Sequence, residues 1–373
     1  MLNYKFYLFI FFLFAPYLSF GVFGSDLSIF YLMGVALASF LLKIRFEDFL
    51  LLFIAVLLLF CSPPDLTLYF LKFNASAFLI IQTFRLSRKY FVDFFLTQNQ
   101  TFIVSTLWLL SGFITAKFPF VANLLLSRYI VLGAESGGRG FFGLTSEPSL
   151  YGLQSVFLLA FVLINNRKSI FQYTFKDYYS LTLIITACLL SKSVFALGFL
   201  PLILLNHISL VYDFDYLIFI KIFRRKSLLF TILTLSIALF LGLYAYLNLF
   251  PDSRFSIYTV GLINSSDFIE YFLDDKSFAV RFQSFQILYS TLFNLDSNSF
   301  STAGFSILFM AFDWYAFLFV FAFYFSSKTI RSIARLIRLK SISFLLYTIL
   351  LIVGPMYISI SWLFLGSLKY SEK

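Results

Sequence analysis

Residues 137–164 read GGRGFFGLTSEPSLYGLQSVFLLAFVLI, and the change of character within this stretch decides the fold class. A polar, glycine-rich segment passes directly into an apolar run, and apolar runs of about 17–25 residues cross the hydrocarbon core of a membrane. Glu147, Pro148 and Ser149 predict a helix start, with the proline at the first helical position. A helix start presents free N–H groups and the positive end of a dipole, where anions bind. A tight surface loop before a capped helix is the alternative interpretation.

The composition of the whole chain predicts an all-α, polytopic membrane protein with a single domain over residues 1–373. Of these 373 residues, 61% are hydrophobic and only 12% are charged, whereas soluble domains carry about 25% charged residues. The net charge of +10 is then typical of the positive-inside bias rather than of nucleic-acid binding. Two cysteines, one histidine and the absence of a nucleotide-binding fingerprint favour neither a disulfide framework, nor a metal site, nor a cofactor.

Apolar runs recur along the sequence and predict about eleven membrane-spanning helices. The first run resembles a signal peptide, but no convincing cleavage site follows it, so we expect it to be retained. Residues 251–303 form the largest polar segment and are predicted to be one large loop. The segment 118–133 is apolar but interrupted, and it predicts a helix near the outer face or a half-buried helix. The expected spans are residues 6–23, 27–42, 49–61, 66–84, 100–116, 148–164, 179–190, 194–210, 227–250, 305–325 and 344–365.

The positions of the basic residues predict the orientation of these spans. If the N-terminus is inside and the spans alternate, most of the 28 Lys and Arg residues fall on the inner side, as the positive-inside rule requires. This orientation puts the glycine-rich stretch 137–149, the short polar break 191–193 and the loop 251–303 on the same, outer side. Internal repeats are not evident.

A few charges do not fit the positive-inside pattern. Asp313 lies about two turns into an expected span, where an acid is costly and more often functional than not. Lys72, inside another span, is a candidate partner. Solvation or pairing with acids of the loop is one interpretation of the outer-side arginines. The other is a basic pocket for an anionic ligand such as a lipid-linked diphosphate. These arginines are Arg128, Arg139, Arg254 and Arg281.

Three stretches together resemble a known family. Residues 139–149 (RGFFGLTSEPS) are similar to its R-x-x-G-L-x-x-E-P-S segment before a span. Residues 189–193 (LLSKS) are similar to its Ser-rich turn, and residues 275–281 (DKSFAVR) to the D-x-S-x-x-x-R segment of its large loop. More weakly, residues 305–320 are similar to its helix after that loop, with Asp313 where an acid often stands. The family is the O-antigen polymerase and ligase superfamily of Wzy-type bacterial membrane glycosyltransferases.

The resemblance implies an activity and a place for it. Members join oligosaccharide repeats carried on undecaprenyl diphosphate at the periplasmic face of the bacterial inner membrane, without a metal or a nucleotide sugar. The implied fold is of the membrane glycosyltransferase class C type, and the implied partners are lipid-linked oligosaccharides, membrane lipids, a chain-length regulator and a flippase. The ligase branch carries a histidine late in the large loop. Residues 295–300 (LDSNSF) lack it, which favours a polymerase over a ligase.

The same resemblance suggests residue roles. Arg139 and Arg281 are expected to stabilise the diphosphate leaving group, since fixed cations at developing charge often give the largest catalytic effect. Glu147 is the first candidate for the general base and Asp275 the second, although Glu147 as a helix cap or an ion-pair partner stays open. A transporter or flippase is the alternative class, but such folds usually show repeats and short outer loops. The expected substrate-binding residues are Arg128, Gly138, Gly140, Ser191, Ser193, Arg254, Ser277 and Asp313.

Overall fold

The computed structural model shows a helical protein. Its described residues form helices joined by turns and include no β-strand, which confirms the all-α class for this part of the chain. Within the same part, no helix combines the length and the apolar character that crossing a membrane requires. The described residues are 4–18, 28–40, 42, 48–49, 52–53, 56–57, 60, 67–91, 94, 96–118, 120–121, 140–141, 143–145, 148–165, 172–211, 241–264, 283–284, 286–287, 289–290 and 305–320.

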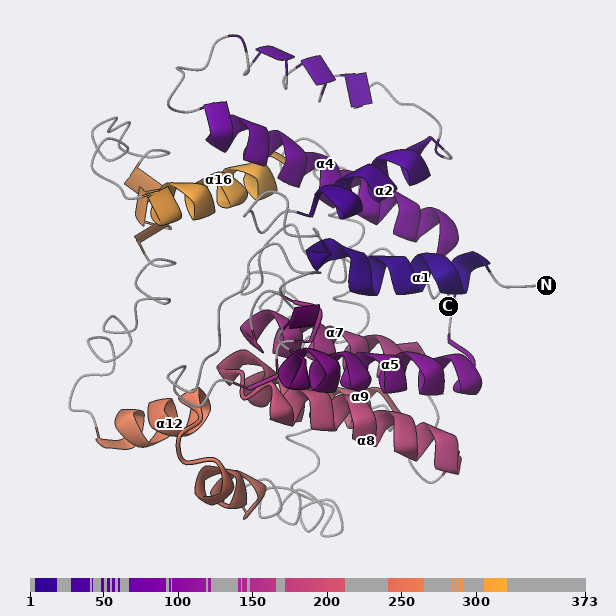
Figure 1. Ribbon diagram of the computed structural model, residues 1–373, viewed down its shortest axis with the longest axis vertical. Coiled ribbons are helices and arrows are strands. Elements are labelled where there is room, and N and C mark those ends of the chain that lie inside the picture. The colour runs from indigo at the N-terminus through magenta and orange to yellow at the C-terminus, as the bar shows by residue number, and fades with distance from the viewer. Residues whose placement is uncertain are drawn as a thin grey trace, which may run out of the picture.

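The helices fall into two groups. Figure 1 shows α5, α7, α8 and α9 packed together, with α1, α2, α4 and α16 beside them. The bounds are α1 Tyr4–Phe14, η1 Ala15–Tyr17, α2 Ile29–Ser39, α4 Thr67–Tyr90, α5 Gln98–Lys117, α7 Pro148–Asn165, α8 Phe175–Leu190, α9 Val194–Val211, α12 Arg254–Asn264 and α16 Phe305–Val320. The run predicted at 344–365 lies outside the described residues, as do most of 49–61 and 118–133 and the first part of 227–250.

Local sequence signals explain where several helices begin and end. Pro148 is the first residue of α7, as predicted. Thr97 and Gln100 form a capping box at the start of α5, and Thr174 and Asp177 form another at the start of α8. The polar break predicted after residue 190 is confirmed, because Ser191 caps α8 and a new helix begins at Val194.

Two expected segments differ from the helices that form. The run predicted at 6–23 is not one helix, because α1 ends at Phe14 and a 3-10 turn containing Pro16 follows. Proline lacks the N–H that a continuing helix would use, and its ring clashes with the preceding turn. The run predicted at 66–84 continues as a helix to Tyr90. Arg88 and Lys89 then lie in its last turn, where cations complement the helix dipole.

Helix α7 is buried from residue 150 to residue 163, and aromatic contacts join it to α5. The rings of Trp108 and Tyr151 stack with centroids 4.7 Å apart. Trp108 Nε1 donates to Ser155 Oγ at 2.7 Å, and Tyr151 Oη donates to the Trp108 carbonyl at 2.8 Å. Both aromatic side chains are fully buried, so their polar atoms are satisfied inside an apolar core.

Helices α5 and α8 run parallel. Gln98 Nε2 donates to Asp177 Oδ2 at 3.1 Å, and Lys176 Nζ donates to Asn99 Oδ1 at 2.7 Å. These four residues lie in the first turns of the two helices, so both helices begin at the same end of the group. The predicted alternation of spans requires this common direction.

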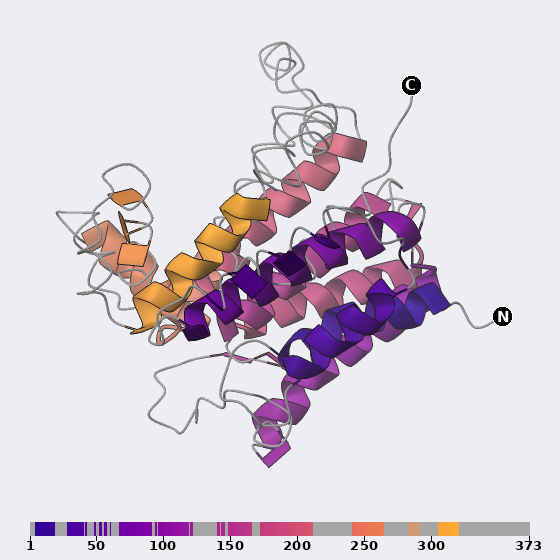
Figure 2. The same cartoon turned by 90° about the horizontal axis from the view of Figure 1, so that it is seen from above.

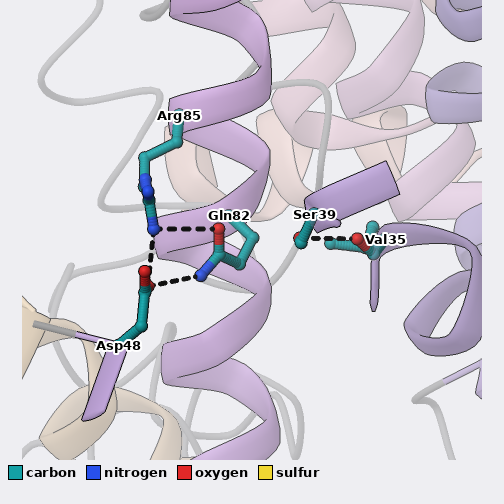
Figure 3. A network of polar contacts seen from close by, with 5 residues as sticks. All are labelled: Val35, Ser39, Asp48, Gln82 and Arg85. Carbon is teal, nitrogen blue, oxygen red and sulfur yellow. Dashed lines mark hydrogen bonds and ion pairs between the residues drawn. The ribbon is translucent and has the colours of Figure 1, made fainter. Parts of the chain in front are cut away.

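Helices α4 and α16 lie side by side in both views (Figures 1 and 2) and are also parallel. Tyr69 stacks on Phe312 with ring centroids 5.4 Å apart, and Phe73 meets Phe319 at 5.6 Å. Further along α4, Arg85 is buried and its Nη1 lies 2.5 Å from Asp48 Oδ1 (Figure 3). Gln82 Nε2 donates to the same carboxylate oxygen at 2.9 Å, so this acid ties the segment before α4 to its last turns.

Candidate functional site at the turn between α8 and α9

The glycine-rich stretch packs directly on the turn between α8 and α9. The backbone N–H of Phe141 donates to the Leu190 carbonyl at 2.8 Å. A Cβ at Gly140 would overlap the backbone of Leu190 and Ser191. This close approach therefore requires glycine at position 140.

The residues after Gly140 turn back toward the start of α7. Gly143 has φ +54°, in the left-handed region, and a Cβ there would overlap the ring of Tyr151. Thr145 at the end of this turn is buried. The same Tyr151 ring stacks on Trp108. The Tyr151 ring of α7 thus packs between Gly143 of the glycine-rich turn and Trp108 of α5.

The side-chain oxygens of Ser191 and Ser193 shape the α8–α9 turn. Ser191 Oγ donates to the Cys188 carbonyl at 2.6 Å and accepts from the Ser193 N–H at 3.2 Å. Ser193 Oγ in turn accepts from the Ala196 N–H at 3.4 Å, in the first turn of α9. Both serines are buried, and a Cβ at Gly152 of α7 would come within 2.6 Å of Ser191 Oγ. These hydroxyls hold the turn against α7.

Lys192, between the two serines, reaches a third segment. Its Nζ lies over the Phe250 ring, 5.3 Å from the centroid. Phe250 begins the turn that leads into α12: its carbonyl accepts from the Ser253 N–H at 3.0 Å, and Ser253 Oγ accepts from the Ser256 N–H at 3.1 Å. The start of the long loop therefore lies beside the serine turn.

Some of the predicted site residues lie within the described part of the chain, and the others lie outside it. The structure brings Gly140, Ser191 and Ser193 together, and Arg254 is the first residue of α12, next to the Phe250 turn. Asp313 lies in α16, which packs on the helix that carries the buried Lys72. The others lie outside the described residues: Arg128, Gly138, Arg139, Glu147, Asp275, Ser277 and Arg281.

Several residues of this junction were not singled out from the sequence. Lys192 lies within the Ser-rich stretch 189–193. Its position between two predicted spans was a sequence signal for a role at a helix junction. Gly152 and Phe250 offered none, because their roles depend on which helices are neighbours. Gln154 is fully buried on α7, and its amide atoms have no hydrogen-bond partner among the described residues. A buried amide in this state favours an additional polar group, such as water or a ligand atom.

A second polar cluster lies where α5 and α8 begin. Tyr173 Oη and His207 Nε2 are 2.8 Å apart. Burial, with the nearby Asp177 carboxylate and Tyr178, raises the pKa of Tyr173 to about 12. The phenol therefore stays protonated at neutral pH and ties the segment before α8 to α9. Within the described parts of the chain, no cluster of His, Cys, Asp and Glu could hold a metal ion.

Comparison with known protein families, with curated proteins and with solved structures gives no match. The geometry itself defines the candidate site as the junction of residues 140–145, 191–193 and 250–254. It combines a turn that only glycine permits, the N-terminal turn of α9 and a lysine. Such a combination suits an anion, because helix starts and fixed cations both favour negative charge.

Proposed function

We propose that this protein is a membrane glycosyltransferase that polymerises oligosaccharide repeats carried on undecaprenyl diphosphate at the periplasmic face of the bacterial inner membrane. The junction of residues 140–145, 191–193 and 250–254 forms part of its diphosphate site. The observation that carries the proposal is the hydrogen bond from Phe141 to Leu190. It joins in space two distant stretches, 139–149 and 189–193, that resemble the polymerase family.

The contact of Lys192 with Phe250 adds the start of the third region. The long loop begins there, and the remaining resembling stretch, residues 275–281, lies within it. The described start of the loop therefore lies beside the serine turn, and Asp275 and Arg281 follow later in the same loop, outside the described residues. An active site assembled from these regions needs this arrangement.

The exposed side chains support a membrane environment. Helix α12, at the start of the long outer loop, buries Ser256 but exposes Ile257, Val260 and Ile263 at 53%, 48% and 73%, as a helix lying on a membrane surface would. This reverses the usual pattern of a helix on a water-soluble protein. Large contiguous apolar surfaces mark contacts with membranes or other proteins. Helix α5 is similar, with exposed Phe102, Ile103, Leu107, Leu110, Phe113 and Ile114.

The proposed reaction transfers a growing glycan to a new acceptor. A hydroxyl of the acceptor sugar attacks the anomeric carbon of the growing chain, and the bond from that carbon to undecaprenyl diphosphate breaks. The proton of the hydroxyl passes to a carboxylate, with Glu147 as the first candidate and Asp275 as the second. Arg139 and Arg281 stabilise the negative charge that develops on the diphosphate.

The glycans of a strain that lacks the gene test the proposal. A polymerase defect leaves a single repeat attached to the final acceptor, and this is the expected result. A ligase defect would leave polymer on the lipid carrier, and a flippase defect would leave the repeat facing the cytoplasm. Either of these outcomes would refute the polymerase assignment.

The arginines provide a second test in the same strain. Complementation with Arg139→Ala or Arg281→Ala should abolish polymer while leaving the single-repeat product and the protein level intact. Arg→Lys variants should rescue poorly, because a point charge does not reproduce a bidentate guanidinium. Full polymer from both alanine variants would exclude the diphosphate site.

A further inference from the structure

Lys192 occupies a backbone position that normally belongs to glycine. It follows the C-cap residue Ser191 of α8, and its N–H donates to the Leu189 carbonyl at 3.1 Å. Its φ is +50°, and among the described residues it is the one non-glycine residue with positive φ. Helices commonly end in this conformation with glycine, because a Cβ is strained there. The chain keeps a long cationic side chain where the backbone alone would favour none.

Two structural explanations account for this lysine only in part. A cation after a helix C-terminus complements the dipole, but this does not require the strained position. The ammonium also lies over the half-buried Phe250 ring, and a cation–π contact is modest in strength. An ammonium has three N–H donors, and a ring face leaves some of them available for other acceptors. No carboxylate among the described residues is paired with Lys192.

The surroundings of Lys192 indicate which acceptor would suit it. The glycine-rich turn packs on the residue before it, through Gly140 and Ser191. The N-terminal turn of α9 begins directly after it, held by the Ser193 cap. Arg254 begins α12 just beyond the Phe250 turn. A multiply charged anion at this junction would meet a cation and helix N–H groups together.

We infer that Lys192 is a diphosphate-binding residue whose ammonium leaves the Phe250 ring to contact the diphosphate of a prenyl carrier. The inference rests on the proposed function and adds a cation to its arginines. In this structure the ammonium lies over the Phe250 ring. The hydrogen bonds of Ser191 and Ser193 fix the backbone turn from which the Lys192 side chain extends.

Binding measurements on the purified full-length chain in detergent test this role. The probes are farnesyl diphosphate, which has a prenyl tail, and inorganic pyrophosphate, which has none. Lys192→Gly should weaken farnesyl diphosphate binding by about tenfold or more, since it removes a charge-assisted contact. Its thermal stability should hold or rise, because glycine accepts the positive φ without strain. Lys192→Arg should bind within about threefold of the wild type, because it keeps the charge.

Lys89→Gln is the matched control. Lys89 also lies over an aromatic ring, that of Tyr90 at 5.1 Å, but in the last turn of α4. This variant should bind like the wild type. Binding of Lys192→Gly within twofold of the wild type would overturn the inference while leaving the proposed function intact. A folded wild-type protein that binds neither probe would instead overturn the proposed function. Equal binding of both probes would show that the site recognises free diphosphate and would overturn the prenyl carrier as its ligand.

Discussion

Single atoms decide the geometry of the candidate site. At Gly140 the neighbouring backbone comes so close that no side chain fits, and at Gly143 the backbone is left-handed. Lys192 shows the opposite choice, since it keeps its side chain in spite of a left-handed backbone. Glycine is thus used where the chain must approach itself, and lysine where a cation is useful.

Gly140→Ala tests the close approach. The added methyl would force the glycine-rich turn away from Leu190, and overpacking of this kind costs about 1–3 kcal/mol. We expect a lower melting temperature in detergent and loss of polymerised glycan. Gly198→Ala is the matched control, because nothing lies within 4 Å of its added Cβ and alanine favours a helix over glycine. A Gly140→Ala protein as stable and active as Gly198→Ala would contradict the packing described here.

Glu147→Gln separates a catalytic role from a capping role. If Glu147 is the base, the variant should bind lipid-linked substrate but lose turnover, and the pH–rate profile should lose its acidic limb. If the residue only caps α7, activity should persist, because a lost cap costs only about 1 kcal/mol of stability. Turnover of purified protein over a range of pH distinguishes the two. Near wild-type turnover would return Glu147 to a structural role and make Asp275 the next carboxylate to test.

At the scale of the elements, polar contacts set which helices pair and in which direction. Trp108 and Ser155 join α5 to α7, and Gln98 and Asp177 align the starts of α5 and α8. Inside an apolar core such bonds are directional, whereas the apolar contacts around them are not. The same logic places Arg85 against Asp48 at the end of α4.

The Arg85–Asp48 pair gives a prediction about stability. Arg85 is only 8% exposed, and Asp48→Asn would remove the carboxylate charge that lies 2.5 Å from its guanidinium. Breaking a buried pair costs about 3–5 kcal/mol, whereas replacing both partners costs much less. We expect Asp48→Asn to lower the melting temperature in detergent more than the double variant Asp48→Leu/Arg85→Met does. A double variant that is the less stable of the two would show that the pair is not buried as described.

At the scale of the whole molecule, the proposed function requires the helices to cross a membrane in one orientation. The parallel pairs α5 with α8 and α4 with α16 agree with the predicted alternation of spans. The junction of residues 140–145, 191–193 and 250–254 lies at the end where α8 finishes and α9 starts. The proposed function places this end on the periplasmic side.

Reporter fusions test that assignment. Fusions after Asn166 and after Ser332 should report a cytoplasmic position, because the basic residues that flank them follow the positive-inside rule. Fusions within residues 267–298 should report a periplasmic position. A cytoplasmic signal from this loop would place the diphosphate site on the wrong side for a polymerase and would exclude the proposed pocket.

The sequence by itself determined the helical class and several of the places where helices begin and end. Pro148 begins α7 and Ser191 ends α8 as predicted, because proline and serine act through their own backbone and nearest neighbours. The exception at Pro16 is also local, since the proline ended a helix that the apolar pattern alone would have continued. Signals that act only on neighbouring residues can be read from a single sequence.

Only the tertiary structure decided which of these local features meet. Nothing in the sequence shows that Phe141 bonds to Leu190, that Gly152 packs on Ser191 or that Lys192 reaches Phe250. Apolar faces attract one another without direction, so the pattern of runs permits many helix arrangements. Close packing and the pairing of buried polar groups select one of them. That selection placed the glycine-rich turn, the serine turn and the start of the long loop together.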